Sequence, residues 1–162
     1  MAYISFQPND YFNTKLYTGN GSTQAITGVG FQPDWVWLKD RTDGDNHQIY
    51  DVVRGVTKSL QANNNNAEIT FADGLTAFGT DGFTLGSNDQ HNGSSDNFVS
   101  WNWKGGTTSG IATNGSTTIT PSAYSFDQAR GISILKFTGN GVDGAKIAHG
   151  LGAAPEVIWL KT

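Results

Sequence analysis

The feature that most constrains the fold is a stretch that occurs twice in the chain. Residues 17–39 read YTGNGSTQAITGVGFQPDWVWLK, and residues 137–161 read FTGNGVDGAKIAHGLGAAPEVIWLK. Both copies open on an aromatic residue followed by Thr-Gly-Asn-Gly, pass through a Gly-x-Gly step and a proline, and close on Trp-Leu-Lys. A long internal repeat indicates repeated structural units. Because Tyr17 and Phe137 lie 120 positions apart, we expect a repeating unit of that length.

The repeat predicts two parts in the chain. Residues 1–129 should form one unit, and residues 130–162 should begin a second, homologous unit. In the alternative arrangement, the second copy packs on the first unit and completes it. Both copies contain a glycine-asparagine turn, a glycine-proline corner and an apolar strand, so they should occupy equivalent places in their sheets.

Amino-acid usage favours an all-β protein. Glycine accounts for 21 of the 162 residues, aromatic residues make up 12 %, and Glu68 and Glu156 are the only glutamates. Glycine, asparagine and threonine between short aromatic and β-branched runs favour strands joined by tight turns. No segment keeps an apolar period of 3.6 residues, and many short strands with frequent turn signals are typical of a sandwich. The predicted fold class is an all-β, antiparallel β-sandwich.

Charge and cysteine content exclude several classes of protein. The formal net charge is −4 and no basic stripe is present, so we expect no nucleic-acid partner. No apolar run approaches the roughly 20 residues of a membrane-spanning helix, so we expect no membrane segment. The chain has no cysteine, which removes disulfides and thiolate metal sites. The first residues lack the regions of a secretory signal, so we expect assembly in the cytoplasm.

Two segments have the strongest strand patterns. In residues 34–39, Trp35 and Trp37 share one face and aliphatic side chains share the other, so we expect a strand covered on both sides. In residues 97–104, a valine and two tryptophans alternate with phenylalanine and small polar residues, which predicts one apolar and one mixed face. Upstream, the Gly-Asn-Gly sequence at residues 19–21 lies between two apolar runs and predicts a β-hairpin.

Several of these stretches together carry a family resemblance. They read YFNTKLYTGNGS, GVGFQPDWVWLKDR, NHQIYDVVRG, TDGFTLGSN and NFVSWNWKGG, at residues 11–22, 28–41, 46–55, 80–88 and 97–106. The chain resembles the concanavalin A-like (LamG-type) jelly-roll repeat of tailed-bacteriophage virion structural proteins, particularly those of marine phages. The resemblance implies a jelly-roll sandwich in a fibre or appendage protein, present in multiple copies near the host-contacting surface. It does not imply catalysis.

The segment NHQIYDVVRG contains three polar residues that could act together: His47, Asp51 and Arg54. One interpretation is a catalytic or ligand-binding set. We favour a structural polar network in which Asp51 pairs with Arg54. No activated nucleophile and no second base lie nearby in the sequence, as a catalytic set would require.

Three aspartates lie at short spacing around a glycine in KDRTDGDNH: Asp40, Asp43 and Asp45. Calcium takes 6–8 oxygen ligands, and concanavalin-like sandwiches use calcium in loops, so these carboxylates are candidate ligands. The spacing lacks the bidentate glutamate and the full length of an EF-hand loop. The alternative is an ordinary exposed acidic loop, and no other cofactor is expected.

The chain has five tryptophans, and some of them could stack on sugar rings. Trp35 and Trp37 are candidates for glycan contact, together with His91 in the polar stretch at residues 87–96, which should be an exposed loop. Strand aromatics more often pack in a core or a subunit interface. We therefore expect Trp101 and Trp103 to be buried.

These observations favour a bacteriophage virion structural protein, specifically the N-terminal jelly-roll region of a tail or head fibre or capsid appendage. Its expected partners are other virion structural proteins and further copies of itself, with a trimer as one candidate by analogy with fibres. It should assemble in the host cytoplasm and reside in the virion. The alternative is a lectin-like module that binds host surface glycans. A glycan-degrading enzyme is the least favoured interpretation, because no pair of acids is spaced for glycoside hydrolysis.

Overall fold

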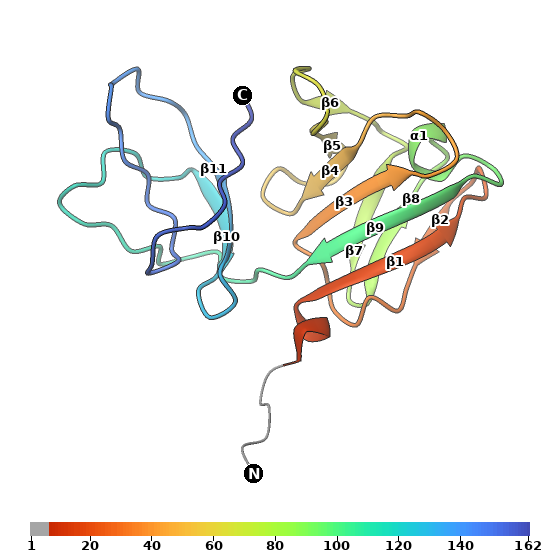
Figure 1. Cartoon of the computed structure of the whole chain (residues 1–162), viewed down its shortest axis with the longest axis horizontal. Coiled ribbons are helices and arrows are strands. Elements are labelled where there is room, and N and C mark those ends of the chain that lie inside the picture. The colour runs from red at the N-terminus through yellow and green to blue at the C-terminus, as the bar shows by residue number, and fades with distance from the viewer. Residues whose placement is uncertain (1–6) are drawn as a thin grey trace, which may run out of the picture. The chain divides into compact units, whose positions relative to one another are not determined.

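The computed structural model describes residues 7–162, whose regular secondary structure consists almost entirely of β-strands (Figure 1). The predicted apolar start at residues 3–6 lies outside the described residues. The chain forms two compact units: unit 1 extends to Lys104, and unit 2 comprises residues 105–161. This boundary lies earlier in the chain than the predicted division between residues 129 and 130. It falls there because the last strand of unit 1 ends next to a stretch rich in glycine, threonine and serine.

Short strands dominate both units. In unit 1 they are β1 (Phe12–Thr18), β2 (Gln24–Ile26), β3 (Trp35–Asp40), β4 (Gln48–Asp51), β5 (Lys58–Ser59), β6 (Ile69–Thr70), β7 (Leu75–Gly79), β8 (Gly82–Leu85) and β9 (Asn97–Trp103). Unit 2 contains β10 (Ala123–Asp127) and β11 (Ile132–Lys136). The 3-10 helix η1 (Pro8–Asp10) and the helix α1 (Asp89–Asn92) belong to unit 1. No helix among the described residues has the length and apolar content needed to cross a membrane.

Unit 1 is a sandwich of two antiparallel sheets. The larger sheet has the strand order β1-β9-β3-β4, and the smaller sheet has the order β2-β8-β7. A two-stranded ribbon of β5 and β6 accompanies them, and Figure 1 shows the larger sheet lying across the smaller one. Two stacked antiparallel sheets define a β-sandwich, so the predicted fold class is confirmed. The jelly-roll connectivity stays a prediction.

The core of unit 1 lies between the two sheets. It is a cluster of buried apolar side chains from both of them: Ile26, Val36, Leu38, Tyr50, Leu75, Phe83 and Leu85. Burial of one such side chain stabilises the fold by about 1.5–3 kcal/mol. Val36 and Leu38 occupy alternate positions of β3, as the sequence pattern predicts, so the two-residue period sets which face of this strand points inwards.

The turn at residues 19–21 forms, but the predicted hairpin is wrong. Gly21 has a φ of 64°, and the side chain of Asn20 accepts the N–H of Ser22 at 2.8 Å. The strands on either side of the turn belong to different sheets, because β1 pairs with β9 and β2 pairs with β8. The N–H of Gly21 donates to the carbonyl oxygen of Asn92 in α1 at 2.8 Å, which fixes the turn as a crossing between sheets.

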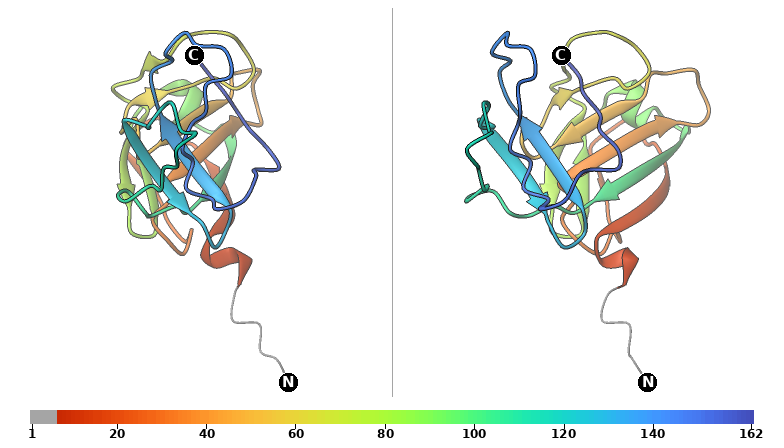
Figure 2. Two further views of the ribbon diagram at one scale, coloured as in Figure 1. Left: turned by 90° about the vertical axis from the view of Figure 1, so that its left-hand side faces the viewer. Right: turned by 60° about the vertical axis from the view of Figure 1, so that its left-hand side comes forward.

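Unit 2 is built on one hairpin and long connections. β10 and β11 pair antiparallel, with Ala123 opposite Lys136 and Asp127 opposite Ile132, and the two arrows lie together in the left view of Figure 2. A small set of apolar side chains is buried in this unit: Ile119, Phe126, Ile134 and Ala148. Most of the remaining chain in unit 2 forms turns and irregular segments.

Candidate functional site

The larger sheet of unit 1 has an aromatic outer face on the side opposite the core. The alternation of three adjacent strands places the following side chains on this outer face: Phe12, Leu16, Trp35, Trp37, Val99, Trp101 and Trp103. Leu16 is 63 % exposed, and the tryptophans are half-buried. Aromatic rings that are partly exposed on a sheet suit contact with a protein surface or a sugar ring.

The rings of the outer face form two rows across the strands. Trp35 lies opposite Trp103, and Trp103 lies opposite Phe12, with ring centroids 6.0 Å and 4.8 Å apart. In the next row Trp37 lies opposite Trp101, with ring centroids 5.3 Å apart. Tilted aromatic pairs at such distances contribute about 0.5–1.5 kcal/mol each beyond their buried area. The cross-strand pairs therefore hold the rings in a fixed arrangement.

The predicted burial of Trp101 and Trp103 is wrong, because both are half-buried on the outer face. The inner face of β9 carries Ser100 and Asn102 instead, and both are fully buried. Inside the sandwich, Asn102 Nδ2 donates to the carbonyl oxygen of Asn13 at 3.0 Å and to Ser100 Oγ at 3.0 Å, whereas Asn102 Oδ1 is buried without a hydrogen-bond partner. The alternation along β9 is therefore as predicted, but the mixed face points to the core.

His47 lies beside the outer face and does not join the predicted network with Asp51 and Arg54. Its Nδ1 accepts a hydrogen bond from Trp37 Nε1 at 3.0 Å, and its backbone N–H donates to Asn63 Oδ1 at 3.0 Å. Burial, followed by the nearby positive charge of Lys39, lowers the pKa of His47. A neutral ring is required for Nδ1 to accept this bond, so the electrostatics and the geometry agree.

The predicted pairing of Asp51 with Arg54 is confirmed. Arg54 Nε lies 2.7 Å from Asp51 Oδ2, and the Arg54 backbone N–H donates to Asp51 Oδ1 at 2.8 Å. The guanidinium also donates to the carbonyl oxygens of Ile49 at 2.9 Å and Lys58 at 3.1 Å, and Glu68 lies 3.5 Å away. The guanidinium is thus committed to fastening the loop after β4 to β5, which is a structural role.

The structure places His91 inside the sandwich, which corrects its predicted contact with glycans. The side chain is 0 % exposed because α1 turns it inwards from the stretch expected to be an exposed loop. His91 Nε2 lies 2.6 Å from the Tyr50 hydroxyl, and Nδ1 lies 2.6 Å from Asn88 Oδ1. Burial lowers the pKa of His91 to about 4, with a weak opposing effect from Asp73. The neutral ring donates from Nδ1 to Asn88 and accepts from Tyr50.

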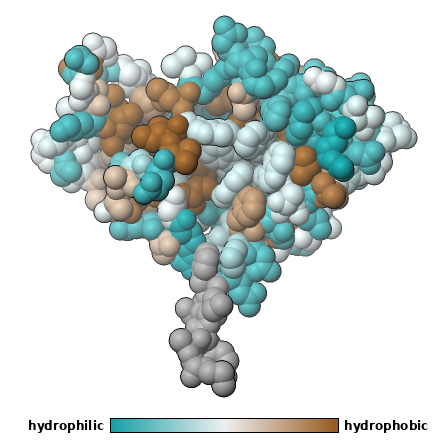
Figure 3. Space-filling view, in the orientation of Figure 1, coloured by the Kyte–Doolittle hydropathy of each residue, from teal (hydrophilic) through white to brown (hydrophobic). Residues whose placement is uncertain are grey.

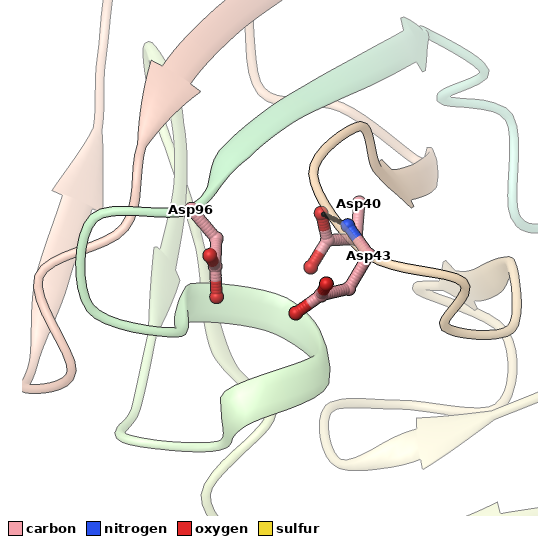
Figure 4. A group of neighbouring side chains, drawn as sticks. All are labelled: Asp40, Asp43 and Asp96. Carbon is pink, nitrogen blue, oxygen red and sulfur yellow. Dashed lines mark hydrogen bonds between the residues drawn. The ribbon is translucent and has the colours of Figure 1, made fainter.

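Three carboxylates converge at one end of the larger sheet (Figure 4). Asp40 and Asp43 come from the end of β3 and the loop after it, and Asp96 directly precedes β9. One oxygen from each carboxylate lies within 4.8 Å of the others. β3 and β9 are hydrogen-bonded neighbours, so their adjacent ends bring these residues together. Asp45 is not a member of this group, so the structure assembles only part of the predicted ligand set.

The carboxylates of Asp40, Asp43, Asp45 and Asp96 repel one another. Desolvation, followed by the charges of Asp40 and Asp43, raises the pKa of Asp96. Desolvation and the same two charges also raise the pKa of Asp45. A cation placed among them would relieve this repulsion, since an opposite charge within a few ångströms stabilises the ionised carboxylate.

Lys39 already supplies a positive charge to the same loop. Its Nζ donates to the carbonyl oxygens of Asp43 at 3.1 Å and Asp45 at 3.0 Å, and also to that of Asp40. Asp40 Oδ1 accepts the backbone N–H groups of Thr42 at 2.7 Å and Asp43 at 3.0 Å. Calcium prefers 6–8 oxygens, and the loop carbonyls are committed to the ammonium group. The oxygen atoms that remain suit a weak calcium site in which water supplies several ligands, rather than a site formed by protein ligands alone.

Asp96, Phe12 and Leu16 are not indicated by the sequence alone, because they lie far along the chain from their spatial neighbours. Their positions follow from strand pairing: Asp40 lies opposite Phe98, so Asp96 falls just beyond the end of the same strand pair. Alternation places Phe12 and Leu16 on one face of β1, but only the pairing with β9 sets them beside the tryptophans. The missing information was strand order and register.

A scan against protein families matches residues 7–162 to the family described as "Domain of unknown function (DUF7483)". The chain belongs to the DUF7483 family. The match spans unit 1 and unit 2, so both compact units are part of one DUF7483 domain. No curated protein and no solved structure matches the chain significantly.

Proposed function

We propose that this DUF7483 chain is a structural protein of a bacteriophage virion, in which it forms the jelly-roll region of a tail or head fibre or a capsid appendage. Its role is to take part in particle assembly and host attachment. The observation that carries the proposal is the internal repeat within an all-β chain that lacks cysteine. Tandem β-units joined end to end are suited to building an extended appendage.

The backbone supports the view that the two copies are related structural units. Gly28 and Gly150 occupy matched positions and have φ values of 76° and 75°. Gly21 and Gly141 are also matched and have φ values of 64° and 69°. Only glycine adopts this left-handed region without strain, so both copies depend on the same turn chemistry.

The polar residues nominated for chemistry support a non-catalytic role. His91 is enclosed in the core, and Arg54 is held by Asp51 and by backbone carbonyls. A catalytic base or nucleophile must reach its substrate, and these groups are engaged within the fold. The proposed partners are other virion structural proteins and further copies of this chain, with a trimer as one candidate assembly and the virion as the location.

The proposal is tested on purified particles of the virus that encodes the chain. Mass spectrometry should find the polypeptide in the particles in several copies, and gold-labelled antibodies raised against residues 7–162 should mark an appendage in electron micrographs. Light scattering on the purified chain should show an oligomer. If infected cells contain the polypeptide and purified particles lack it, the virion proposal is wrong.

A second candidate function is glycan binding, and the aromatic outer face favours it specifically. Partly exposed tryptophans in fixed rows can stack on the apolar faces of sugar rings. A glycan array with the whole chain should then give a hit that Trp37→Ala abolishes. Leu16→Ala is the matched control, because Leu16 is an exposed aliphatic residue on the same face and offers no ring. Equal loss in both variants, or the absence of any glycan hit, would contradict recognition by stacking on the Trp37 ring.

A further inference from the structure

The repeat extends upstream into the strands of both units. Residues 14–19 read TKLYTG and residues 134–139 read ILKFTG, with the same spacing of 120 positions. In sequence, β11 therefore corresponds to the first part of β1. Unit 2 thus contains a counterpart of the edge strand of the larger sheet.

The C-terminal stretch corresponds in sequence to β3, a strand of that sheet whose inner face is buried. Residues 34–39 read DWVWLK and residues 156–161 read EVIWLK. In β3, Val36 and Leu38 are 0 % and 1 % exposed, whereas the matched Ile158 and Leu160 are 75 % and 70 % exposed. Residues 157–161 form no strand. Figure 3 shows hydrophobic surface gathered over unit 2 in this view.

The two copies have the same local turn, so the difference begins at the strand itself. Asn20 Oδ1 accepts the N–H of Ser22 at 2.8 Å, and the matched Asn140 Oδ1 accepts the N–H of Val142 at 3.0 Å. The glycines that follow share positive φ values in both copies. Local sequence therefore builds the same corner twice, and a neighbouring strand is what the second copy lacks.

In unit 1, that neighbour is β9, which lies between β1 and β3 and pairs antiparallel with both. In unit 2, β11 pairs with β10 alone among the described strands. No segment of residues 105–161 resembles the NFVSWNW sequence of β9. Unit 2 therefore holds counterparts of β1 and β3 without the strand that joins them.

The backbone of β11 directs its free edge to the side where β9 lies in unit 1. In β1, Gly19 N–H donates to Asp96 O at 2.8 Å and Tyr11 O accepts from Lys104, so odd-numbered residues face β9. In unit 2, Lys136 O accepts from Ser122 N–H at 2.8 Å, on the side of β10. Because alternate residues point to opposite edges, the odd-numbered residues 133–137 face away from β10.

We propose that unit 2 binds one antiparallel β-strand of the β9 type, inserted between β11 and residues 157–161. Its chemistry follows from β9: aromatic and aliphatic side chains alternate with phenylalanine and small polar side chains over about seven residues. The small polar positions of this strand face the side chains of Ile158 and Leu160, as Asn102 and Ser100 lie opposite Val36 and Leu38 in unit 1.

The strand comes from another polypeptide segment of β9 type rather than from the β9 of this chain. β9 already pairs along both edges, with β1 and with β3. Its removal would break both ladders and expose the core beneath them. Addition of a separate strand to an open edge has no such cost and is a general mode of peptide recognition. This inference does not depend on the virion proposal.

The test uses the whole chain and a labelled synthetic peptide of residues 96–104, DNFVSWNWK. Fluorescence anisotropy should show saturable binding, and hydrogen exchange should slow at residues 133–137 and 157–161. Ile158→Asp should weaken binding by about tenfold or more, since it removes a buried aliphatic contact. Val142→Asp is the matched control, because Val142 is also exposed and apolar but lies outside the site, and it should change binding less than about twofold.

A modified peptide keeps the test independent of any protein variant. N-methylation of the amide at Ser100 removes the N–H that would pair with β11 and leaves the side chains unchanged, so binding should be lost. The proposal is overturned if the unmodified peptide does not bind or if the N-methylated peptide binds equally well. It is also overturned if the chain instead self-associates through residues 157–161, with association removed by Ile158→Asp and no binding of peptide.

Discussion

The two copies of the repeat share a sequence pattern and a turn geometry, yet they have different surroundings. In the first copy the apolar strand is β3, with a neighbour on each side and an inner face in the core. In the second copy the matched residues 157–161 form no strand and expose their apolar side chains. The comparison teaches that short-range sequence builds the corner and that adjacent strands decide whether the following segment becomes part of a sheet.

The largest effect is expected when the matched leucines of the two copies of the repeat are each replaced. Leu38→Ala should lower the free energy of unfolding of unit 1 by about 2–5 kcal/mol, because it leaves a cavity between the sheets. Leu160→Ala, at the matched exposed position, should change it by less than about 0.5 kcal/mol. Urea denaturation of both variants measures the difference. Equal losses would show that the second copy is buried in solution and would break the comparison.

Acidification should lower the stability of unit 1 more than that of unit 2, because α1 with its buried His91 supports only the first copy of the repeat. Unfolding raises the pKa of His91 from about 4 to its ordinary value of 6.5, so protonation favours the unfolded state. The contribution is fully present above pH 6.5 and is lost as the pH falls towards 4, by up to about 3 kcal/mol. Denaturation midpoints measured from pH 7 to 4 should show this slope in unit 1.

His91→Gln serves as the control for this pH dependence, since glutamine does not titrate. The variant should be less stable at pH 7 and should have a flatter profile between pH 6.5 and 4. An unchanged slope in His91→Gln would assign the pH dependence to other groups.

A smaller difference in stability is expected when the matched glycines just before the two turns are each replaced by alanine. A Cβ at Gly19 would lie 2.1 Å from the Gly93 carbonyl oxygen, whereas a Cβ at Gly139 would meet nothing within 4 Å. Gly19→Ala should therefore destabilise unit 1 by about 1–3 kcal/mol. Gly139→Ala should be neutral or stabilise slightly, by less than about 1 kcal/mol, through the unfolded state. Thermal unfolding of the pair measures this, and comparable losses would mean that both turns are braced alike.

The smallest expected effect concerns the acidic loop at residues 40–46, which follows the first copy of the repeat. Asp96→Asn should raise the melting temperature slightly at low ionic strength, because it relieves repulsion from Asp40 and Asp43. Millimolar calcium should produce a similar rise in the wild-type chain and little in Asp96→Asn, which calorimetry can follow. A calcium-dependent rise of equal size in both chains would place the ion elsewhere.

Much of the local structure was predictable from short stretches. The alternation in residues 34–39 and 97–104 predicts β3 and β9, and the aspartate and arginine of residues 51 and 54 pair as their spacing suggests. The glycines at residues 21, 28 and 30 adopt the positive φ values that their turns require. These features depend on residues close in sequence, so no knowledge of strand order was needed.

The candidate surfaces were predictable only in part. Trp35 and Trp37 share a face by strand periodicity alone, but the two tryptophans of β9 join them because that strand pairs in a register that turns its polar side chains inwards. His91 looks exposed in a polar stretch, yet α1 folds it beneath the sheets against Tyr50. The third carboxylate of the acidic group, Asp96, lies just before β9 and is far from Asp40 and Asp43 in the sequence.

The sequence by itself determined the all-β class, the tight glycine turns and the existence of two related copies, because these follow from side-chain periodicity and backbone freedom. Tertiary structure alone decided which face of β9 is inside, which charges meet and which copy of the repeat gains strand neighbours. The physical reason is that sheet hydrogen bonds join residues far apart in the chain, so strand order and register are not encoded within any one segment. The exposed second copy shows this directly.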